Sequence, residues 1–91
     1  MDGIGAGGVL PEMWPVVSEL MSDAAASSVA EVAAAVKLLA ERAHVIAEGA
    51  GAVSVAAALA GAGGTGKVVC IVSGGNLDLA KLSVILAGGV P

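Results

Sequence analysis

The sequence predicts an α/β fold in which helices alternate with the strands of a parallel sheet. Two observations carry this prediction. Residues 67–72, Lys-Val-Val-Cys-Ile-Val, form a continuous β-branched and apolar run, as strands buried on both faces do. Helical patterns stand before and after this run, and such alternation is typical of layered α/β architectures. One clear strand does not complete a sheet, so we expect residues 1–91 to form a single incomplete α/β unit.

The composition indicates a chain that needs a covering partner. Of the 91 residues 57% are hydrophobic, but 14 are Gly and Trp14 is the only aromatic residue, so the apolar side chains are mostly small. A domain of this size hides only about 60–65% of its unfolded surface. We therefore expect the remaining apolar surface to be covered in a homo-oligomer or by a longer companion chain. The net charge of −4, with no basic patch, argues against a nucleic-acid partner.

The N-terminal part predicts a loop, a helix and a short strand. Residues 1–10 are rich in Gly and predict a loop. Pro11 suits the first turn of a helix over residues 11–21. Position alone, between two helical patterns, suggests a strand at residues 24–27. The expected apolar face of the helix consists of Trp14, Val17, Leu20 and Met21.

A capping box predicts the start of the next helix. Ser28 is followed three residues later by Glu31, and this spacing lets each side chain accept a hydrogen bond from the other residue's backbone N–H. The helix is expected to run from residue 29 to residues 42–44. Its apolar stripe consists of Val32, Val36, Leu39 and Ala43.

The remaining elements alternate with glycine-rich connections. A turn at residues 45–47 leads through Glu48-Gly-Ala-Gly to a helix of small residues at 52–60, which Gly61 should end. A loop at residues 61–66 precedes the strand. The turn at residues 73–76 then leads into a helix over residues 77–87, ended by two glycines. The side chains expected to point inward from it are mostly Leu79, Leu82, Val84, Ile85 and Leu86.

The Ser-Gly-Gly-Asn turn at residues 73–76 is the most suggestive candidate for chemistry. It joins a strand to a helix, where glycines let a ligand approach the backbone and the helix N-terminus offers unpaired N–H groups. A plain tight turn is the alternative interpretation. Glu48 stands in a weakly charged region and is either a helix-start carboxylate or a group of a cofactor site.

The other chemically interesting residues favour structural interpretations. No second His, Cys or paired carboxylate stands at metal-ligand spacing from His44. We therefore expect His44 to be a surface or helix-end imidazole. Cys70 is alone within an apolar run, which predicts an inert core thiol and a reducing, cytoplasmic location. Residues 45–66 carry only Glu48 as a charge, but Gly and Ala dominate them, so we expect no membrane span.

Five short motifs, in order, resemble the C-terminal part of the catalytic domain of pyridoxal-phosphate-dependent serine/threonine dehydratases, the threonine ammonia-lyases. The strongest is Ser-Gly-Gly-Asn after an apolar strand. The motifs are Asp2-Gly3-Ile4, Leu10-Pro11-Glu12, Ser28-Val29-Ala30-Glu31-Val32, Ala47-Glu48-Gly49-Ala50-Gly51-Ala52 and, after the apolar run, Ser73-Gly74-Gly75-Asn76-Leu77-Asp78.

This resemblance implies a fold and a cofactor site. The fold would be the C-terminal portion of a three-layer parallel-sheet domain of the tryptophan-synthase-β-like arrangement, called fold type II. Ser73 would hydrogen-bond the pyridine nitrogen of pyridoxal phosphate, and Glu48 would lie beside the cofactor. The remaining implied cofactor-site residues are Gly3, Gly74, Gly75 and Asn76.

The sequence departs from the family in what it lacks. The family holds its cofactor covalently on the lysine of a Ser-x-Lys segment and binds the phosphate with a separate glycine loop, and neither is present here. Lys37, Lys67 and Lys81 lack that context, so we assign no catalytic residue. The implied function is a fragment or subunit of an enzyme that converts the amino acids L-threonine or L-serine to a 2-oxo acid and ammonia by β-elimination. We expect it to be inactive alone. Two alternatives stay open, a self-assembling non-catalytic fragment and a small anion-binding βα module.

Overall fold

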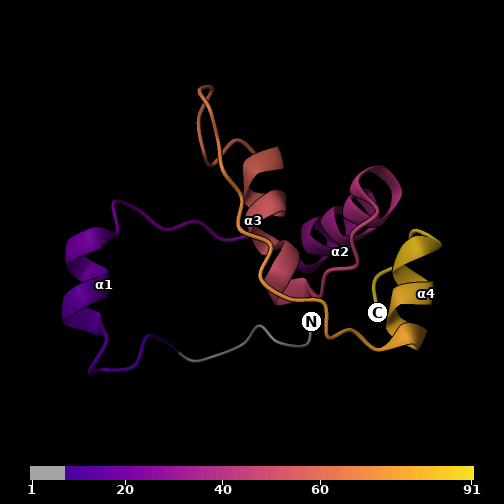
Figure 1. Cartoon of the computed structure of the whole chain (residues 1–91), viewed down its shortest axis with the longest axis horizontal. Coiled ribbons are helices and arrows are strands. Elements are labelled where there is room, and N and C mark those ends of the chain that lie inside the picture. Colours follow the sequence, from indigo (N-terminus) through magenta and orange to yellow (C-terminus); the bar gives the residue numbers. More distant parts are fainter. Residues whose placement is uncertain (1–7) are drawn as a thin grey trace.

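The computed structural model describes residues 8–91 and shows a helical chain (Figure 1). Most of the predicted N-terminal loop, with Gly3, therefore lies outside the described residues. No residue from 8 to 91 is assigned to a strand. The elements are α1 (Trp14–Leu20), α2 (Val29–Leu38), the π-helical turn η1 (Leu39–Ala43), α3 (Gly49–Leu59) and α4 (Leu79–Leu86).

Helix α2 begins as the capping box predicts. The Glu31 N–H donates to Ser28 Oγ over 3.1 Å, and the Ser28 N–H donates to Glu31 Oε1 over 2.9 Å. The helix continues directly into η1, so the predicted end near residues 42–44 is confirmed. His44 ends it in the left-handed region at φ 56°, as a helix-end residue on the exposed surface.

Removing the cap hydroxyl should destabilise the chain, and acid should do the same to the wild type. Ser28→Ala leaves a helix N–H without its partner and should cost about 1 kcal/mol in the free energy of unfolding. Hydrogen bonds from the Ser28 backbone and then its side chain lower the pKa of Glu31. A lowered folded-state pKa means that this contribution is present above the unfolded-state pKa and is lost as pH falls through the folded value. Urea unfolding followed by helix circular dichroism, at neutral pH and in acid, measures both effects.

The matched control for this prediction is Ser18→Ala. The Ser18 hydroxyl is also exposed, but it donates to the Pro15 carbonyl within α1 and caps no helix. An unfolding midpoint lowered equally by both substitutions would contradict the capping argument.

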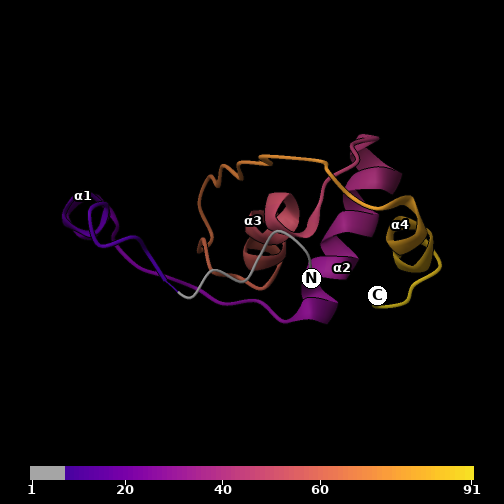
Figure 2. The same ribbon diagram turned by 90° about the horizontal axis from the view of Figure 1, so that it is seen from below.

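The core lies where α2 packs against α3 and α4, and its side chains are small. Ile85 and Val36 are the largest side chains that are almost completely buried. Figure 2 shows α2 between α3 and α4. The buried hydrophobic residues are Val32, Ala33, Ala35, Val36, Ala47, Ala52, Ala56, Leu82 and Ile85.

The expected apolar faces are only partly buried. In α2 and η1, Val32 and Val36 are buried and Leu39 is half-buried, but Ala43 is exposed. In α4 only Leu82 and Ile85 are buried, so the prediction for Leu79, Val84 and Leu86 is wrong for this chain. Only the side of α4 that faces α2 joins the core, and no helix between residues 8 and 91 covers its outer side.

Helix α1 stands apart from the core in both ribbon views (Figures 1 and 2). It is shorter than the predicted helix over residues 11–21, because the first three of these residues form a turn. Its expected apolar face is mostly uncovered: Val17 is half-buried, whereas Trp14, Leu20 and Met21 are exposed. An amphipathic pattern fixes which side of a helix is apolar, but a second surface is needed to cover it.

The predicted α/β sheet is not confirmed, because no strand occurs among the described residues. Residues 24–27 and 67–72 have no strand assignment. The latter follow an open path beside α3 (Figure 1), where Ser54 Oγ donates to the Ile71 carbonyl over 2.8 Å. A strand is defined by backbone hydrogen bonds to a neighbour. Between residues 8 and 91 no backbone–backbone hydrogen bond involves residues 67–72.

Two glycines end helices as expected. Gly61 follows α3 with φ 89°, and Gly88 follows α4 with φ 91°, both in the left-handed region that favours glycine. The predicted first residues of these two helices were less accurate. Helix α3 begins at Gly49 rather than residue 52, and α4 begins at Leu79 rather than residue 77. These helices were expected to lie on a sheet, and α3 instead packs on α2.

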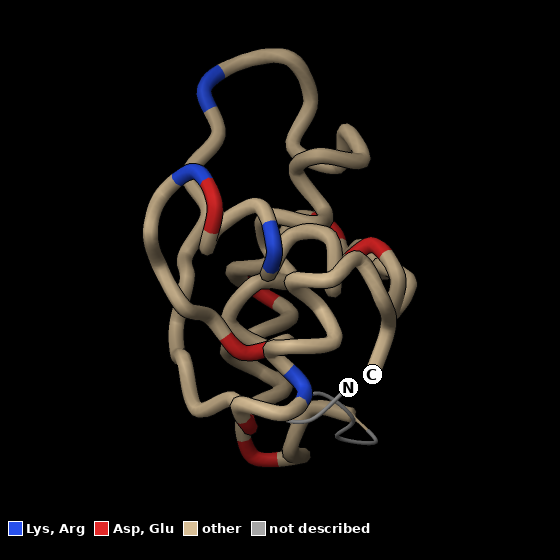
Figure 3. The backbone as a smooth tube through the Cα atoms, turned by 90° about the vertical axis from the view of Figure 1, so that its right-hand side faces the viewer, with Lys and Arg blue, Asp and Glu red and all other residues tan. Residues whose placement is uncertain are grey.

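The charges are distributed without a basic patch. Figure 3 shows the Lys and Arg positions separated along the backbone tube. Among the described residues, no helix is both long enough and apolar enough to span a bilayer.

Candidate functional site at the Ser73 turn

The structure brings the turn at residues 73–76 against the start of α3. The Glu48 N–H donates to the Gly74 carbonyl over 3.0 Å, joining segments 26 residues apart in the chain. The Leu77 N–H donates to the Gly75 carbonyl over 2.9 Å and closes the turn before α4. The turn at residues 73–76 and the segment that begins at Glu48, both singled out from the sequence, are therefore in direct contact.

The junction between this turn and α3 is too close for side chains. A Cβ atom added to Gly51 would collide with the Gly74 carbonyl oxygen and lie 3.0 Å from the Gly74 nitrogen. A Cβ on Gly74 would meet Glu48 Oε1, and one on Gly75 would meet the Ile46 carbonyl oxygen. Gly51 and Gly75 are thus required by close backbone approach rather than by backbone conformation, whereas Gly74 meets the flexible end of the Glu48 side chain.

Glu48 occupies the N-cap position of α3 but does not cap the helix with its side chain. Its backbone is extended (φ −75°, ψ 171°), and no helix N–H donates to its carboxylate. The carboxylate instead contacts the α-carbon region of Gly74, and the residue is half-buried. Glu48 therefore stands at the start of a helix, as one of the two interpretations predicted, but its side chain makes no cap hydrogen bond and lies at the turn.

Ser73 presents its side chain at the surface of this unit. The residue is exposed, and its hydroxyl has no hydrogen-bond partner among residues 8–91. It therefore does not serve the turn as a local cap. Asn76 is also exposed. Gly3, the remaining expected site residue, lies outside the described residues.

The N-terminus of α4 is already occupied by a carboxylate. Asp78 is its N-cap residue, and its Oδ1 accepts the Ala80 N–H over 2.9 Å. This negative charge disfavours a bound anion at the same helix end. The anion-binding interpretation of the turn thus loses its physical basis.

The three lysines lie outside the turn at residues 73–76, on separate parts of the chain. Lys37 lies on α2 and forms an ion pair with Glu41 at 3.7 Å. Lys67 is exposed at the start of the open segment, and Lys81 lies in α4. The exposed Ser73 hydroxyl is thus free to donate to the ring nitrogen of pyridoxal phosphate, and the turn at residues 73–76 contains no lysine for the aldehyde end of that cofactor.

Metal chemistry and thiol chemistry receive no support. The described residues contain no cluster of three or more His, Cys, Asp or Glu side chains able to hold a metal ion. Cys70 is half-buried rather than in the core, and its Sγ lies 3.5 Å from the Ser54 carbonyl oxygen. Ser54 was missed by sequence reasoning, since a lone hydroxyl in a helix of small residues gives no signal of its role.

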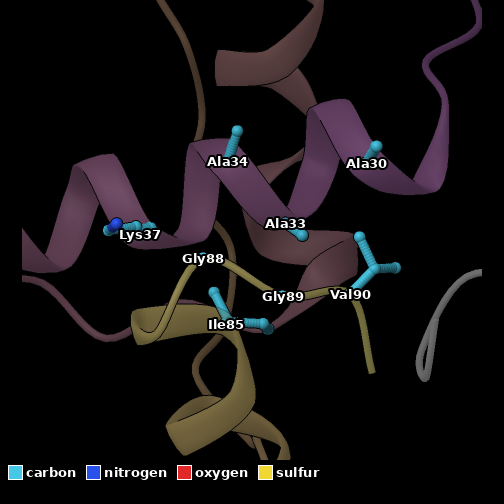
Figure 4. Close-up of a pocket in the computed structure, with 8 residues that line it drawn as sticks. All are labelled: Ala30, Ala33, Ala34, Lys37, Ile85, Gly88, Gly89 and Val90. Carbon is cyan, nitrogen blue, oxygen red and sulfur yellow. The ribbon is translucent and has the colours of Figure 1, made fainter.

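A cavity of about 290 Å³ lies away from this turn, between α2 and the chain after α4. Figure 4 shows its lining, in which Lys37 is the only charged side chain. None of the expected site residues lines it. The lining residues are Ala30, Ala33, Ala34, Lys37, Ile85, Gly88, Gly89 and Val90.

Comparison with known proteins finds similarity to part of one enzyme. The chain is 37% identical over 79 residues to an L-threonine ammonia-lyase of Geobacter sulfurreducens and 41% identical over 78 residues to that of Thermotoga maritima. Each alignment covers 85% of this chain but 20% of the relative. The chain thus spans about a fifth of the length of these relatives. No family model and no solved structure matches it.

Proposed function

We propose that this chain is a fragment or subunit of a pyridoxal-phosphate-dependent dehydratase that acts on L-threonine or L-serine. The overall reaction is β-elimination, in which the amino acid loses its β-hydroxyl as water and ends as a 2-oxo acid and ammonia. The similarity to one region of L-threonine ammonia-lyases supports this proposal. The single structural observation that carries it is the free Ser73 hydroxyl on a turn held by Glu48 and three glycines.

Ser73 is the residue assigned to the cofactor. Its hydroxyl would hydrogen-bond the pyridine nitrogen and hold the ring in place, and Glu48, Gly74, Gly75 and Asn76 would shape the turn. When bound, pyridoxal phosphate supplies an electron sink for the substrate's α-carbon. A neutral hydroxyl does not keep the ring nitrogen protonated, which weakens that sink and suits elimination better than transamination.

The rest of the active site must come from elsewhere in the enzyme. The covalent lysine and the phosphate-binding loop have no counterpart here, and the apolar surface around residues 67–72 lacks a cover. A longer companion chain of fold type II would supply the lysine, the phosphate loop and neighbouring strands. Within that assembly residues 67–72 would be an interior strand of a parallel sheet.

A chimera tests the proposal directly. The matching 78 residues of the Thermotoga maritima L-threonine ammonia-lyase are replaced by the corresponding residues of this chain. We expect the chimera to bind pyridoxal phosphate and form 2-oxobutanoate from L-threonine. The control is the same enzyme with this region deleted, which should form none. A folded chimera that binds the cofactor as the parent does but has no activity on either amino acid would contradict the proposal.

Substitution of Ser73 in the chimera should weaken cofactor binding. Ser73→Ala removes one hydrogen bond, worth about 0.5–1.5 kcal/mol, so the dissociation constant should rise by roughly threefold to tenfold. Ser73→Asp should hold the ring nitrogen protonated and increase the ratio of pyridoxamine phosphate to 2-oxo acid. Cofactor titration and product analysis measure the two effects.

The matched control is Ser83→Ala, which removes an exposed hydroxyl from α4. It should change neither the cofactor affinity nor the product ratio. If both Ser73 variants also left these quantities unchanged, Ser73 would have no role at the ring nitrogen.

A further inference from the structure

The hydrogen bonds that hold residues 67–72 in place both involve one residue, Ser54. Its Oγ donates to the Ile71 carbonyl over 2.8 Å, and its backbone carbonyl accepts from the Cys70 thiol, whose Sγ lies 3.5 Å away. In the described part of the chain, the segment makes no other hydrogen bond. Because Ser73 follows this segment directly, Ser54 holds the chain immediately before the residue assigned to the cofactor.

The helix to which Ser54 belongs does not explain why a serine stands there. Ser54 is the only polar side chain of α3, which otherwise consists of Gly, Ala, Val and Leu. Alanine forms helices better than serine, and a serine hydroxyl within a helix commonly returns to a carbonyl of the preceding turn. Here the residue is half-buried, and its hydroxyl donates across to Ile71 instead. The hydroxyl therefore serves the contact between α3 and the segment before the turn.

Helix α3 holds the chain on both sides of Ser73. Before it, the Ser54 hydroxyl binds the Ile71 carbonyl. After it, the Glu48 N–H donates to the Gly74 carbonyl over 3.0 Å. Six residues of helix rise by roughly 9 Å, and three residues of chain span at most about 10–11 Å. The short stretch that carries Ser73 is thus fixed at both ends with little slack.

We propose that Ser54 is a positioning residue for Ser73. By keeping the Ile71 carbonyl against α3, it fixes the place of the Ser73 hydroxyl before the cofactor arrives, and a preorganised group loses less freedom on binding. This role rests on the proposed function, which assigns Ser73 to the pyridine nitrogen. It is compatible with residues 67–72 as an interior strand, because a carbonyl oxygen has two lone pairs and can accept from Ser54 and from a neighbouring strand.

Amide exchange in the free chain tests the anchor without the cofactor. Ser54→Ala should leave helix circular dichroism unchanged or slightly stronger, because alanine favours the helix. The Glu48 N–H, which donates to the Gly74 carbonyl, should nevertheless exchange at least about threefold faster, because the turn opens more often. Ser54→Thr keeps a hydroxyl and should retain the protection. The matched control is Ser83→Ala on α4, which should not change it; an unchanged exchange rate in Ser54→Ala overturns the proposal.

Cofactor titration in the chimera tests whether Ser54 acts through Ser73. Ser54→Ala should raise the dissociation constant of pyridoxal phosphate by roughly twofold to threefold, less than Ser73→Ala does, because the hydrogen bond to the ring is misaligned rather than removed. In the Ser73→Ala background, Ser54→Ala should have no further effect, since two residues that act on one interaction are not additive. Equal effects of Ser54→Ala in both backgrounds overturn the positioning role.

Failure of this role and failure of the proposed function give different results. If Ser73→Ala leaves the dissociation constant unchanged while Ser54→Ala accelerates exchange at Glu48, the assignment of Ser73 to the cofactor fails, and Ser54 remains the anchor of the turn. If Ser73→Ala weakens cofactor binding and Ser54→Ala changes neither quantity, the proposed function stands and the positioning role is overturned.

Discussion

The isolated chain is expected to form no 2-oxobutanoate from L-threonine and to take no stoichiometric pyridoxal phosphate adduct. An activated lysine must be both close to the cofactor and poised to lose its proton. Lys37 is paired with Glu41, and Lys67 is exposed to solvent. Lys81 lies in α4, and no lysine follows a serine by two positions. The expected loss of activity relative to the active chimera is complete within the sensitivity of the assay.

Borohydride reduction in the presence of pyridoxal phosphate, followed by peptide mapping, measures the adduct. The chimera, treated in parallel, is the positive control because it retains the lysine of the Thermotoga maritima enzyme. A single stoichiometric adduct on Lys37, Lys67 or Lys81, accompanied by 2-oxobutanoate, would show that this chain carries its own catalytic lysine. Scattered low-level labelling of all three would agree with the prediction.

Gly51→Ala should destabilise the chain, because Gly51 of α3 lies directly against the Ser73 turn. Alanine is favoured over glycine in a helix by about 1 kcal/mol, which opposes the effect. The added Cβ, however, meets backbone atoms of Gly74, and backbone cannot rotate away as a side chain can. Overpacking of this kind costs about 1–3 kcal/mol, so the net change should be destabilising. Urea unfolding followed by circular dichroism measures it.

The matched control is Gly66→Ala, because a Cβ at Gly66 would meet nothing within 4 Å. That substitution should leave the unfolding midpoint almost unchanged. Amide exchange at Glu48 gives a local readout, since its N–H donates to the Gly74 carbonyl and should exchange faster when the turn is displaced. Equal stability of the two variants would show that the contact between Gly51 and Gly74 is not tight in solution.

The candidate site was partly accessible from the sequence. Ser73, Gly74, Gly75 and Glu48 were singled out through the resemblance to dehydratases. The structure places Glu48 against Gly74, and the Ile46 carbonyl against Gly75. Local patterns predicted a plain turn and a helix cap instead, because the contact between residues 48 and 74 joins distant parts of the chain. Ile46 contacts Gly75 only through its backbone carbonyl. Every residue type has that carbonyl, so the sequence could not indicate this contact.

The sequence by itself determined the features that depend on neighbouring residues. The Ser28 and Glu31 side chains set the start of α2, and Gly61 and Gly88 set the ends of α3 and α4, because caps satisfy helix backbone groups within a few residues. The apolar periodicity also identified Val32, Val36, Leu82 and Ile85 as buried. The caps are formed by residues within or next to one helix, and the spacing of apolar residues along a helix identifies the side that is buried.

The tertiary structure decided whether residues 67–72 become a strand and whether α1 buries its apolar face. The pattern Val-Val-Cys-Ile-Val predicts a buried strand, but a strand exists only where a second backbone supplies hydrogen bonds. Residues 8–91 offer this segment the hydroxyl of Ser54 in place of a neighbouring strand. Helix α1 likewise has an apolar side that the described residues leave mostly exposed. Apolar patterning thus specifies the surroundings that a segment needs, and long-range contacts decide whether one chain supplies them.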